Sequence, residues 1–271
     1  MHTRKSVHLL WRIADFKQFV MGIALKCIEI NIAVNPCECG FHALSFISAK
    51  VFEKFLSPIL TESGGTGSGK TTFLNVLSGY IPDWERVITI EDSAELQLQG
   101  LRNLVRLETR NGNVEGCREI SVRDLIRASL RMRPDRIVVG EVRGAEAVDM
   151  MQCLNTGHDG SMSTGHANSA RDMLSRLENM ILMGMDIPLA AIRKQIVSGI
   201  DIIVHLGRLR DRSRKVLEIS EILDCEDTVI RLNPLYRFEE AGESPEGRVL
   251  GTLVRKGELL RDQKLRAAGL G

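Results

Sequence analysis

The feature that most constrains the fold is a run of small residues, Gly64-Gly65-Thr66-Gly67-Ser68-Gly69-Lys70-Thr71-Thr72. It matches the phosphate-binding pattern G-x-x-x-x-G-K-[ST] at every fixed position. Glycines let backbone N–H groups approach an anion, the lysine can reach the β and γ phosphates, and the hydroxyl of Thr71 suits Mg²⁺. Phe73, Leu74 and Leu77 then form an apolar helix face, which a flexible linker would lack. The run therefore predicts a nucleotide site at the start of a helix.

Two other segments end in acids where such a site needs them. Residues 87–90 are typical of a buried strand that leads into Glu91-Asp92, and residues 136–139 of another that leads into Gly140-Glu141. Ligands of open α/β sheets bind beyond the carboxyl ends of the strands, where acids can serve a metal ion or the attacking water. Taken alone, the first pair could instead cap a helix, and Glu141 could be a surface residue. We expect catalytic roles for Glu91, Asp92 and Glu141, with Glu141 also at the metal, although Gly140 stands where an Asp is usual.

Arginines supply candidates for contacts with the phosphates. Residues 104–109 alternate as a strand that delivers Arg106 and Arg110, and Arg143 follows Glu141. A helix expected after Ser121 carries a separate arginine stripe at i, i+4 spacing. Such stripes are mostly solvated faces, and the alternative is a subunit edge that offers arginine to the nucleotide of a neighbour. The stripe consists of Arg123, Arg127 and Arg131.

Two histidines bracket a strand of small residues at positions 156–168, namely His158 and His166. A lone histidine is more often structural than catalytic. Two of them beside glycines and a threonine could instead present imidazole N–H groups to a γ-phosphate. Metal binding is the weaker option, because no third ligand has suitable spacing.

Composition limits the remaining function classes. The formal net charge is +1, so bulk charge indicates neither a nucleic-acid partner nor an anionic membrane. The most apolar segment, residues 19–34, is interrupted by Lys26 and Glu29 and is too short to span a bilayer, and no signal peptide is expected. The cysteines fit no disulfide framework or two-pair zinc site, which favours reduced thiols in a cytosolic protein. They are Cys27, Cys37, Cys39, Cys117, Cys153 and Cys225.

The composition changes near residue 57, because six of the eight phenylalanines precede it. We therefore divide the chain into an unassigned segment at 1–57, a main domain at 58–235 and a polar, loosely attached tail at 236–271. Within the main domain, expected strands at 201–206 and 216–223 flank a turn, and residues 229–232 are a candidate hairpin partner. The turn carries Arg208, Arg210, Arg212 and Arg214.

The ordered motifs resemble those of the secretion-superfamily ATPases of type II and type IV systems, and most closely the tight-adherence (Flp/Tad, CpaF-like) pilus-assembly group. The resemblance covers residues 63–235 and rests on the phosphate loop, Glu91-Asp92, Gly140-Glu141-Val142-Arg143-Gly144 and Thr164-Gly165-His166-Ala167-Asn168. It implies an α/β, RecA-like P-loop NTPase domain with a mostly parallel central sheet flanked by helices. It also implies ATP and Mg²⁺ as cofactors, and a homo-hexamer at the cytoplasmic face of the inner membrane that works with pilus or secretion platform proteins.

The resemblance also implies residue roles. Glu91 and Asp92 match the family's Asp box, Glu141 its second acid, and His166 its His box. The implied function is Mg²⁺-dependent ATP hydrolysis that powers pilus assembly or protein secretion. The alternatives are a subunit that binds nucleotide without hydrolysing it, or an inert remnant. A RecA-like nucleic-acid motor is disfavoured by the near-zero net charge and the lack of interleaved aromatic and basic residues.

Three features depart from the family pattern. Residues 1–57 do not resemble its N-terminal domain, Glu62 stands at an apolar strand position, and Gly165 replaces a bulkier apolar residue. The change in composition near residue 57, the missing domain and the polar strand end at Glu62 suggest a truncated or frame-shifted member. The four-cysteine zinc insertion of the type II branch is absent from the sequence, which favours the tight-adherence or type IV branches.

Overall fold

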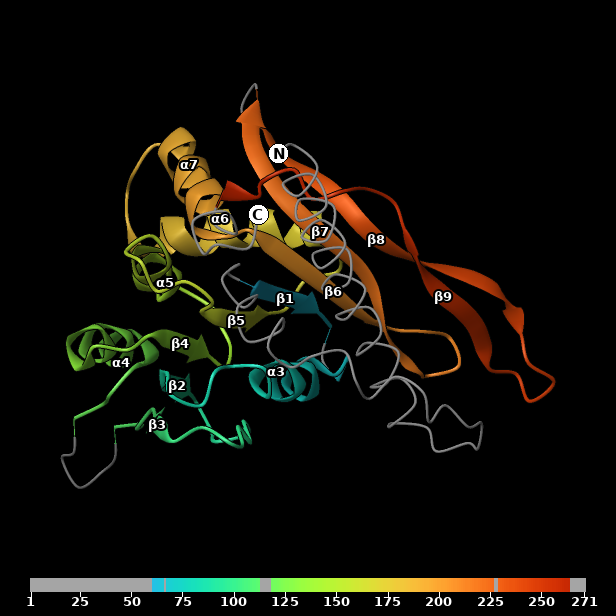
Figure 1. The fold of residues 1–271 in the computed structure, drawn as a ribbon. Helices are drawn as coiled ribbons and strands as arrows, with labels where there is room; N and C mark the ends of the chain where they lie inside the picture. The colour runs from blue at the N-terminus through green and yellow to red at the C-terminus, as the bar shows by residue number, and fades with distance from the viewer. Residues whose placement is uncertain (1–59, 66, 113–117, 227–228, 264–271) are drawn as a thin grey trace, which may run out of the picture.

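A computed structural model describes residues 60–65, 67–112, 118–226 and 229–263 (Figure 1). The segment 1–57, with its expected lack of a family domain, lies outside these residues. The described strands form one sheet in the order β3-β2-β4-β5-β1-β6-β7-β8-β9. Their bounds are β1 Leu60–Gly64, β2 Arg86–Glu91, β3 Asn103–Glu108, β4 Arg136–Val139, β5 Met162–Gly165, β6 Ile202–Arg208, β7 Arg214–Glu226, β8 Val229–Glu243 and β9 Val249–Arg255.

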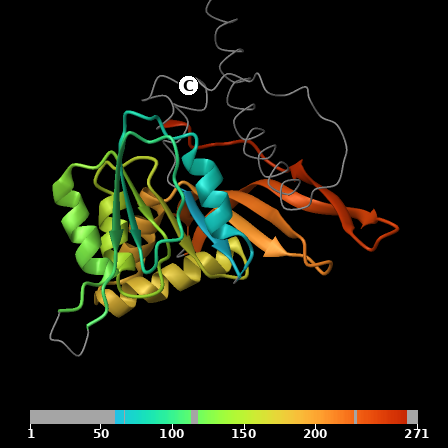
Figure 2. The same cartoon turned by 90° about the horizontal axis from the view of Figure 1, so that it is seen from below.

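The part of the sheet from β3 to β6 is parallel, and β7, β8 and β9 extend it with antiparallel pairs. Among the described residues, helices cover both faces, with α3 on one face and α4 to α7 on the opposite one (Figure 2). The prediction of an α/β fold with a mostly parallel sheet flanked by helices is therefore confirmed. The helices are α3 Lys70–Ser78, α4 Val122–Ser129, α5 Ala147–Leu154, α6 Ala170–Gly184 and α7 Leu189–Gly199, with a 3-10 turn at Leu130–Met132.

Alternation along β4 shows how the sheet divides its core. Val138 packs into the cluster around α3, whereas Ile137 and Val139 pack into the cluster built by α4 to α7. Successive side chains of a strand point to opposite faces, so a strand covered on both sides reads as a continuous apolar run. This is why the strands at 87–90 and 136–139 could be recognised from their sequences.

The arginine stripe of α4 has a structural role that neither sequence interpretation included. Ser121 caps the helix through a capping box, as expected. Arg123 Nε and Arg127 Nε then bind the two carboxylate oxygens of Asp149 on α5, at 2.5 and 2.7 Å. The Asp149 side chain is only 4% exposed, and a buried carboxylate requires charge partners. These two arginines therefore join α4 to α5 within the chain.

The region after residue 235 differs from the expected loose tail. It continues in β8 to Glu243 and returns as β9, and β7 and β8 are both longer than the sequence suggested. The segment that follows is held by Glu221 on β7, whose buried carboxylate accepts hydrogen bonds from the backbone N–H groups of Leu260 and Arg261. Antiparallel strands can face water on one side, so their sequences are polar enough to resemble a tail. The division into 1–57, 58–235 and 236–271 remains a prediction.

None of the helices within the described residues has the length and apolarity needed to cross a bilayer.

Cys153 on α5 provides a test of the packed core. Its side chain is buried, and burial raises the pKa of the thiol to about 12. Because the thiolate is the reactive form, we expect Cys153 to resist alkylation in the folded protein at about pH 8, whereas the half-buried Cys225 reacts. Mass spectrometry of the two peptides after iodoacetamide treatment measures this, with urea-unfolded protein as the control. Equal labelling of both cysteines in the folded state would contradict the packing.

Candidate functional site

The phosphate loop connects the end of β1 to the start of α3. Gly67 and Gly69 have φ values of 73° and 101°, in the left-handed region that favours glycine. The loop is closed by a hydrogen bond from Ser68 N to Gly65 O at 3.2 Å, and α3 begins at Lys70. Backbone N–H groups at the start of a helix are ready donors to an anion. Thr66 lies outside the described residues, and Thr72 is exposed on the first turn of α3.

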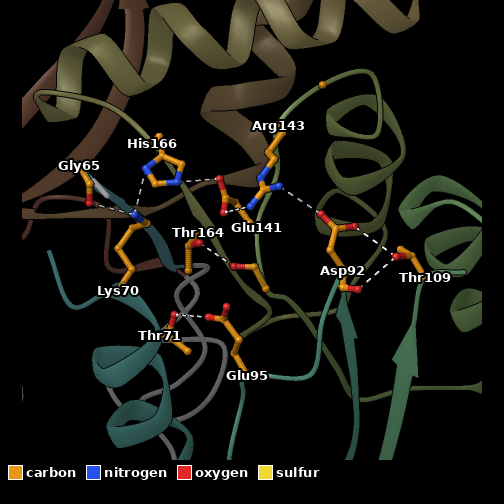
Figure 3. Close-up of polar contacts among 12 residues, drawn as sticks. Gly65, Lys70, Thr71, Asp92, Glu95, Thr109, Glu141, Arg143, Thr164 and His166 are labelled. Carbon is orange, nitrogen blue, oxygen red and sulfur yellow. Dashed lines mark hydrogen bonds and ion pairs between the residues drawn. The ribbon is translucent and has the colours of Figure 1, made fainter. Parts of the chain in front are cut away.

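Polar contacts link the loop lysine to the strand-end acid (Figure 3). Lys70 Nζ lies 3.3 Å from Gly65 O and 3.2 Å from His166 Nδ1. His166 Nε2 lies 2.9 Å from Glu141 Oε1, and Arg143 donates to Glu141 Oε2 at 2.8 Å. We name Lys70, His166 and Glu141 the lysine–histidine–glutamate chain. It joins the expected phosphate ligand, Lys70, to the expected catalytic acid, Glu141, through His166.

Strand order brings these residues together. β5 lies beside β1, with Ser63 opposite Gly165, so His166 follows immediately at the level of the loop. β4 lies beside β5, with Val139 opposite Ser163, and Gly140-Glu141 follows it. Parallel neighbours end at the same edge of a sheet, which is where ligands of such folds bind.

The protonation of the chain follows from its donors and acceptors. The lysine ammonium has only donors, so His166 Nδ1 accepts from it, and the other ring nitrogen, Nε2, lies 2.9 Å from Glu141 Oε1. Burial alone would raise the pKa of Glu141. The hydrogen bond from Arg143, the charges of Arg143 and Lys70 and the adjacent His166 outweigh this effect and place the pKa of Glu141 below its ordinary value. Glu141 is therefore a carboxylate at neutral pH.

The two acids after β2 have different surroundings. Glu91 is buried, and its Oε1 accepts from the backbone N–H groups of Glu95 and Leu96 at 3.0 and 2.8 Å, so it shapes the following loop. Asp92 is exposed and lies 3.5 Å from Arg143 Nη1, at the end of the contacts that pass through Glu141. A Cβ atom on Gly140 would lie 2.9 Å from Cγ of Glu91, which explains glycine where an Asp is usual.

Sequence reasoning missed Glu95. Thr71 Oγ1 donates to Glu95 Oε2 at 3.4 Å, so this acid reaches the residue expected to bind the metal. The loop returns to α3 because Leu96 packs beside it and Gln97 N donates to Asn75 Oδ1 at 2.9 Å. The sequence feature that could have identified Glu95 is its place as the third acid in residues 91–95, directly before the apolar Leu96.

A magnesium ion suits these donors. Within the described residues, no group of three or more His, Cys, Asp or Glu side chains forms a metal cage. Mg²⁺ is usually held by one or two carboxylates together with substrate phosphates and water, and Thr71 with Glu95 offers such hard oxygen ligands. Both oxygens of Glu141, which we also expected at the metal, contact His166 and Arg143 instead.

Three other candidates for phosphate contacts do not reach this loop. Arg106 donates to Leu98 O at 3.2 Å, and Arg110 to Arg118 O at 3.1 Å. Both belong to the β3 edge, and β2, β4 and β5 separate this strand from β1. His158 precedes β5 and contacts Cys153 O at 3.2 Å, so it lies at the opposite end of that strand from His166.

The glycine at position 165 is explained by its neighbour on α6. A Cβ atom on Gly165 would overlap Cε of Met173 and lie 2.9 Å from its Sδ. Met173 is fully buried, so its side chain fills the space that a bulkier residue at 165 would use. A small residue at 165 and a large one at 173 therefore fill the space behind His166 together.

We expect Gly165→Val to lower the free energy of unfolding by about 1–3 kcal/mol, because it overpacks this space. Met173→Ala removes the obstacle, so the double variant should be more stable than the sum of the single effects by about 1 kcal/mol or more. Urea denaturation measures each value. Met180→Ala, also buried on α6, is the matched control and should add to Gly165→Val without coupling. Additive effects in the Met173 pair would contradict the assignment.

The fold and the loop first define a class. A parallel sheet with a glycine-rich loop between strand and helix, and a lysine, a histidine and a carboxylate meeting at the strand ends, is the architecture of a phosphate-loop NTPase. Residues 50–241 match the family described as Type II/IV secretion system protein. The chain belongs to this family.

Individual relatives agree with this assignment. The type IV secretion system protein PtlH of Bordetella pertussis is 41% identical over 162 residues, which are 58% of this chain and 48% of PtlH. The type IV secretion system protein VirB11 of Bartonella quintana is 39% identical over 201 residues, 72% of this chain and 53% of that protein. A crystal structure of the VirB11 ATPase from the Brucella suis type IV secretion system, in complex with sulphate, aligns with a TM-score of 0.56 and 33% identity, covering 63% of this chain and 50% of that one. This chain spans about half the length of these relatives.

Proposed function

We propose that this chain is an ATP-binding and ATP-hydrolysing motor subunit of a secretion or pilus system. The observation that supports this most is the lysine–histidine–glutamate chain, in which Lys70 of the loop contacts Glu141 through His166. A nucleotide-binding loop without turnover has no need for a carboxylate held ionised next to the lysine.

The chemistry follows from the positions of these groups. The loop N–H groups and Lys70 hold the phosphates, and a terminal phosphate competes with His166 Nδ1 for the ammonium of Lys70. Thr71 and Glu95 would hold Mg²⁺, which would neutralise charge on the phosphate oxygens. Glu141 orients a water molecule and accepts its proton as the new bond to phosphorus forms and the bond to the ADP oxygen breaks. Arg143 keeps the carboxylate of Glu141 in place and links it to Asp92.

The finer assignment extends the family resemblance. We propose a homo-hexameric ring at the cytoplasmic face of the inner membrane, peripheral to a pilus or secretion platform. The ordered motifs favour the tight-adherence branch. Arg106 and Arg110 lie at a sheet edge away from their own loop, and we assign them to the site of a neighbouring subunit. An arginine supplied in this way can contribute about 10³ to 10⁵ in rate.

Measurements of nucleotide binding and of ATP hydrolysis distinguish this function from the alternative functions. Mg²⁺–ATP at about 100 times its Kd should stabilise the protein by about 2.7 kcal/mol and raise its Tm by several degrees. Phosphate release should increase per subunit with protein concentration, because a monomer lacks the neighbour's arginine. A Tm shift without phosphate release would select a subunit that binds nucleotide only, and no shift would select an inert remnant. A salt-dependent titration with DNA tests the disfavoured nucleic-acid motor.

A further inference from the structure

The turn between β6 and β7 projects past the end of the strand that carries the phosphate loop. Gly64, the last residue of β1, pairs with Leu206 on β6. The β6–β7 pairing continues beyond this point, with Arg208 opposite Arg214. Arg214 therefore lies two positions beyond the end of β1, at the edge of the sheet where the loop begins.

The side chain of Arg214 lies against the loop. A Cβ atom on Gly69 would be 3.5 Å from Cδ of Arg214, so the alkyl stem passes beside the residue that precedes α3. Throughout the described residues, no hydrogen bond or ion pair holds the exposed guanidinium of Arg214. Two neighbours are engaged, since Arg208 Nε donates to Arg212 O at 3.3 Å and Arg210 pairs with Glu240 and Glu243.

The turn that positions Arg214 is anchored at its tip. Asp211 Oδ1 accepts from Ser213 N at 2.9 Å and from Ser213 Oγ at 2.7 Å. Asp211 Oδ2 accepts from Val249 N on β9 at 2.8 Å, and Leu209 N donates to Ser213 O at 2.8 Å. A fixed backbone lowers the ordering cost when a side chain binds a ligand.

We infer that Arg214 binds the nucleotide and completes the phosphate cradle from the side opposite His166 and Glu141. The strand order β5-β1-β6 sets these sides, because His166 follows β5 whereas Arg214 lies beside β6. A guanidinium is a planar fork suited to phosphate oxygens. Since the terminal phosphate belongs at the lysine–histidine–glutamate chain, Arg214 contacts a part of the nucleotide that ADP and ATP share. This inference rests on the proposed function.

Arg214→Gln in the full chain tests the inference, with Mg²⁺–ADP and Mg²⁺–ATP as the probes. Loss of a charge-assisted contact should weaken the binding of both nucleotides about tenfold or more, and by the same factor for each. The kcat at saturating ATP should stay within about twofold, since the lost contact is equal in substrate and transition state. Arg214→Lys should recover part of the affinity. Arg212→Gln removes the same charge from the same turn without touching the loop and should bind as the wild type does.

Three results would overturn the inference. If Arg214→Gln bound nucleotide with an affinity within about twofold of that of Arg212→Gln, Arg214 would not contact the nucleotide. A defect for ATP alone would place Arg214 at the terminal phosphate instead. A wild-type chain that binds no nucleotide would refute the proposed function and this inference together, whereas the first two results leave the proposed function standing. Equal Tm values for the two variants without nucleotide show that both fold.

Discussion

Glu141→Gln is expected to lower ATP hydrolysis by about 10²- to 10⁴-fold, the range for loss of a positioned general base. The carboxylate oxygens of Glu141 contact His166 and Arg143, and its pKa lies below the ordinary value because the hydrogen bond from Arg143 and the nearby positive charge outweigh the effect of burial. Glutamine keeps the size and one acceptor oxygen, but it cannot take a proton from water. Phosphate release at saturating Mg²⁺–ATP measures the loss.

Nucleotide binding is the internal control for this variant. Because Lys70 and the loop are unchanged, the Tm shift with Mg²⁺–ATP should persist in Glu141→Gln. Glu239→Gln removes an exposed acid of β8 that pairs with Lys256, far along the chain from the loop, and should hydrolyse ATP as the wild type does. Turnover of Glu141→Gln equal to that of Glu239→Gln would rule out Glu141 as the base.

Lys70→Ala is expected to weaken nucleotide binding strongly, before hydrolysis can take place. We expect Kd for Mg²⁺–ADP and Mg²⁺–ATP to rise about 100-fold or more, since hydrogen bonds to charged groups contribute about 1.5–3 kcal/mol each. The substitution also removes the donor that faces His166 Nδ1. Isothermal titration calorimetry with each nucleotide measures the change.

Lys194→Ala is the matched control for this lysine, because Lys194 is exposed on α7. It removes the same charge and should leave nucleotide affinity unchanged. If Lys70→Ala retained wild-type affinity, the glycine loop would not be a phosphate site. The two variants thus fail in different ways: Lys70→Ala loses binding, and Glu141→Gln keeps binding but loses turnover.

Sequence reasoning succeeded where the signal was local. The loop pattern located the β1–α3 junction, and an apolar run ending in an acid located both β2 and β4. Ser121 with Asp124 predicted the start of α4 through their reciprocal capping contacts. Chain order then sufficed to propose that Glu141 and His166 meet Lys70, because adjacent parallel strands end at one edge of the sheet.

What could not be predicted depends on packing between distant segments. Glu95 reaches Thr71 only because its loop folds back onto α3, and Arg214 reaches Gly69 only through the register of β6 with β1. The binding of Arg123 and Arg127 to Asp149 requires α4 and α5 to be neighbours. Long-range pairings of this kind leave no periodic signature along the chain.

Two of the antiparallel strands, β7 and β8, are much longer than the parallel strands. β7 and β8 contain 13 and 15 residues, whereas each parallel strand has between 4 and 7. One end of this strand pair packs against α7, and the end toward the β8–β9 turn extends beyond the helices in Figure 1. A strand as long as β8 measures about 50 Å, so a rotation of about 5° at its base displaces the far end by about 4 Å. The turn beside Gly69 is tied to β9 through Asp211, so any rotation of these strands would also move the turn that contacts the glycine loop.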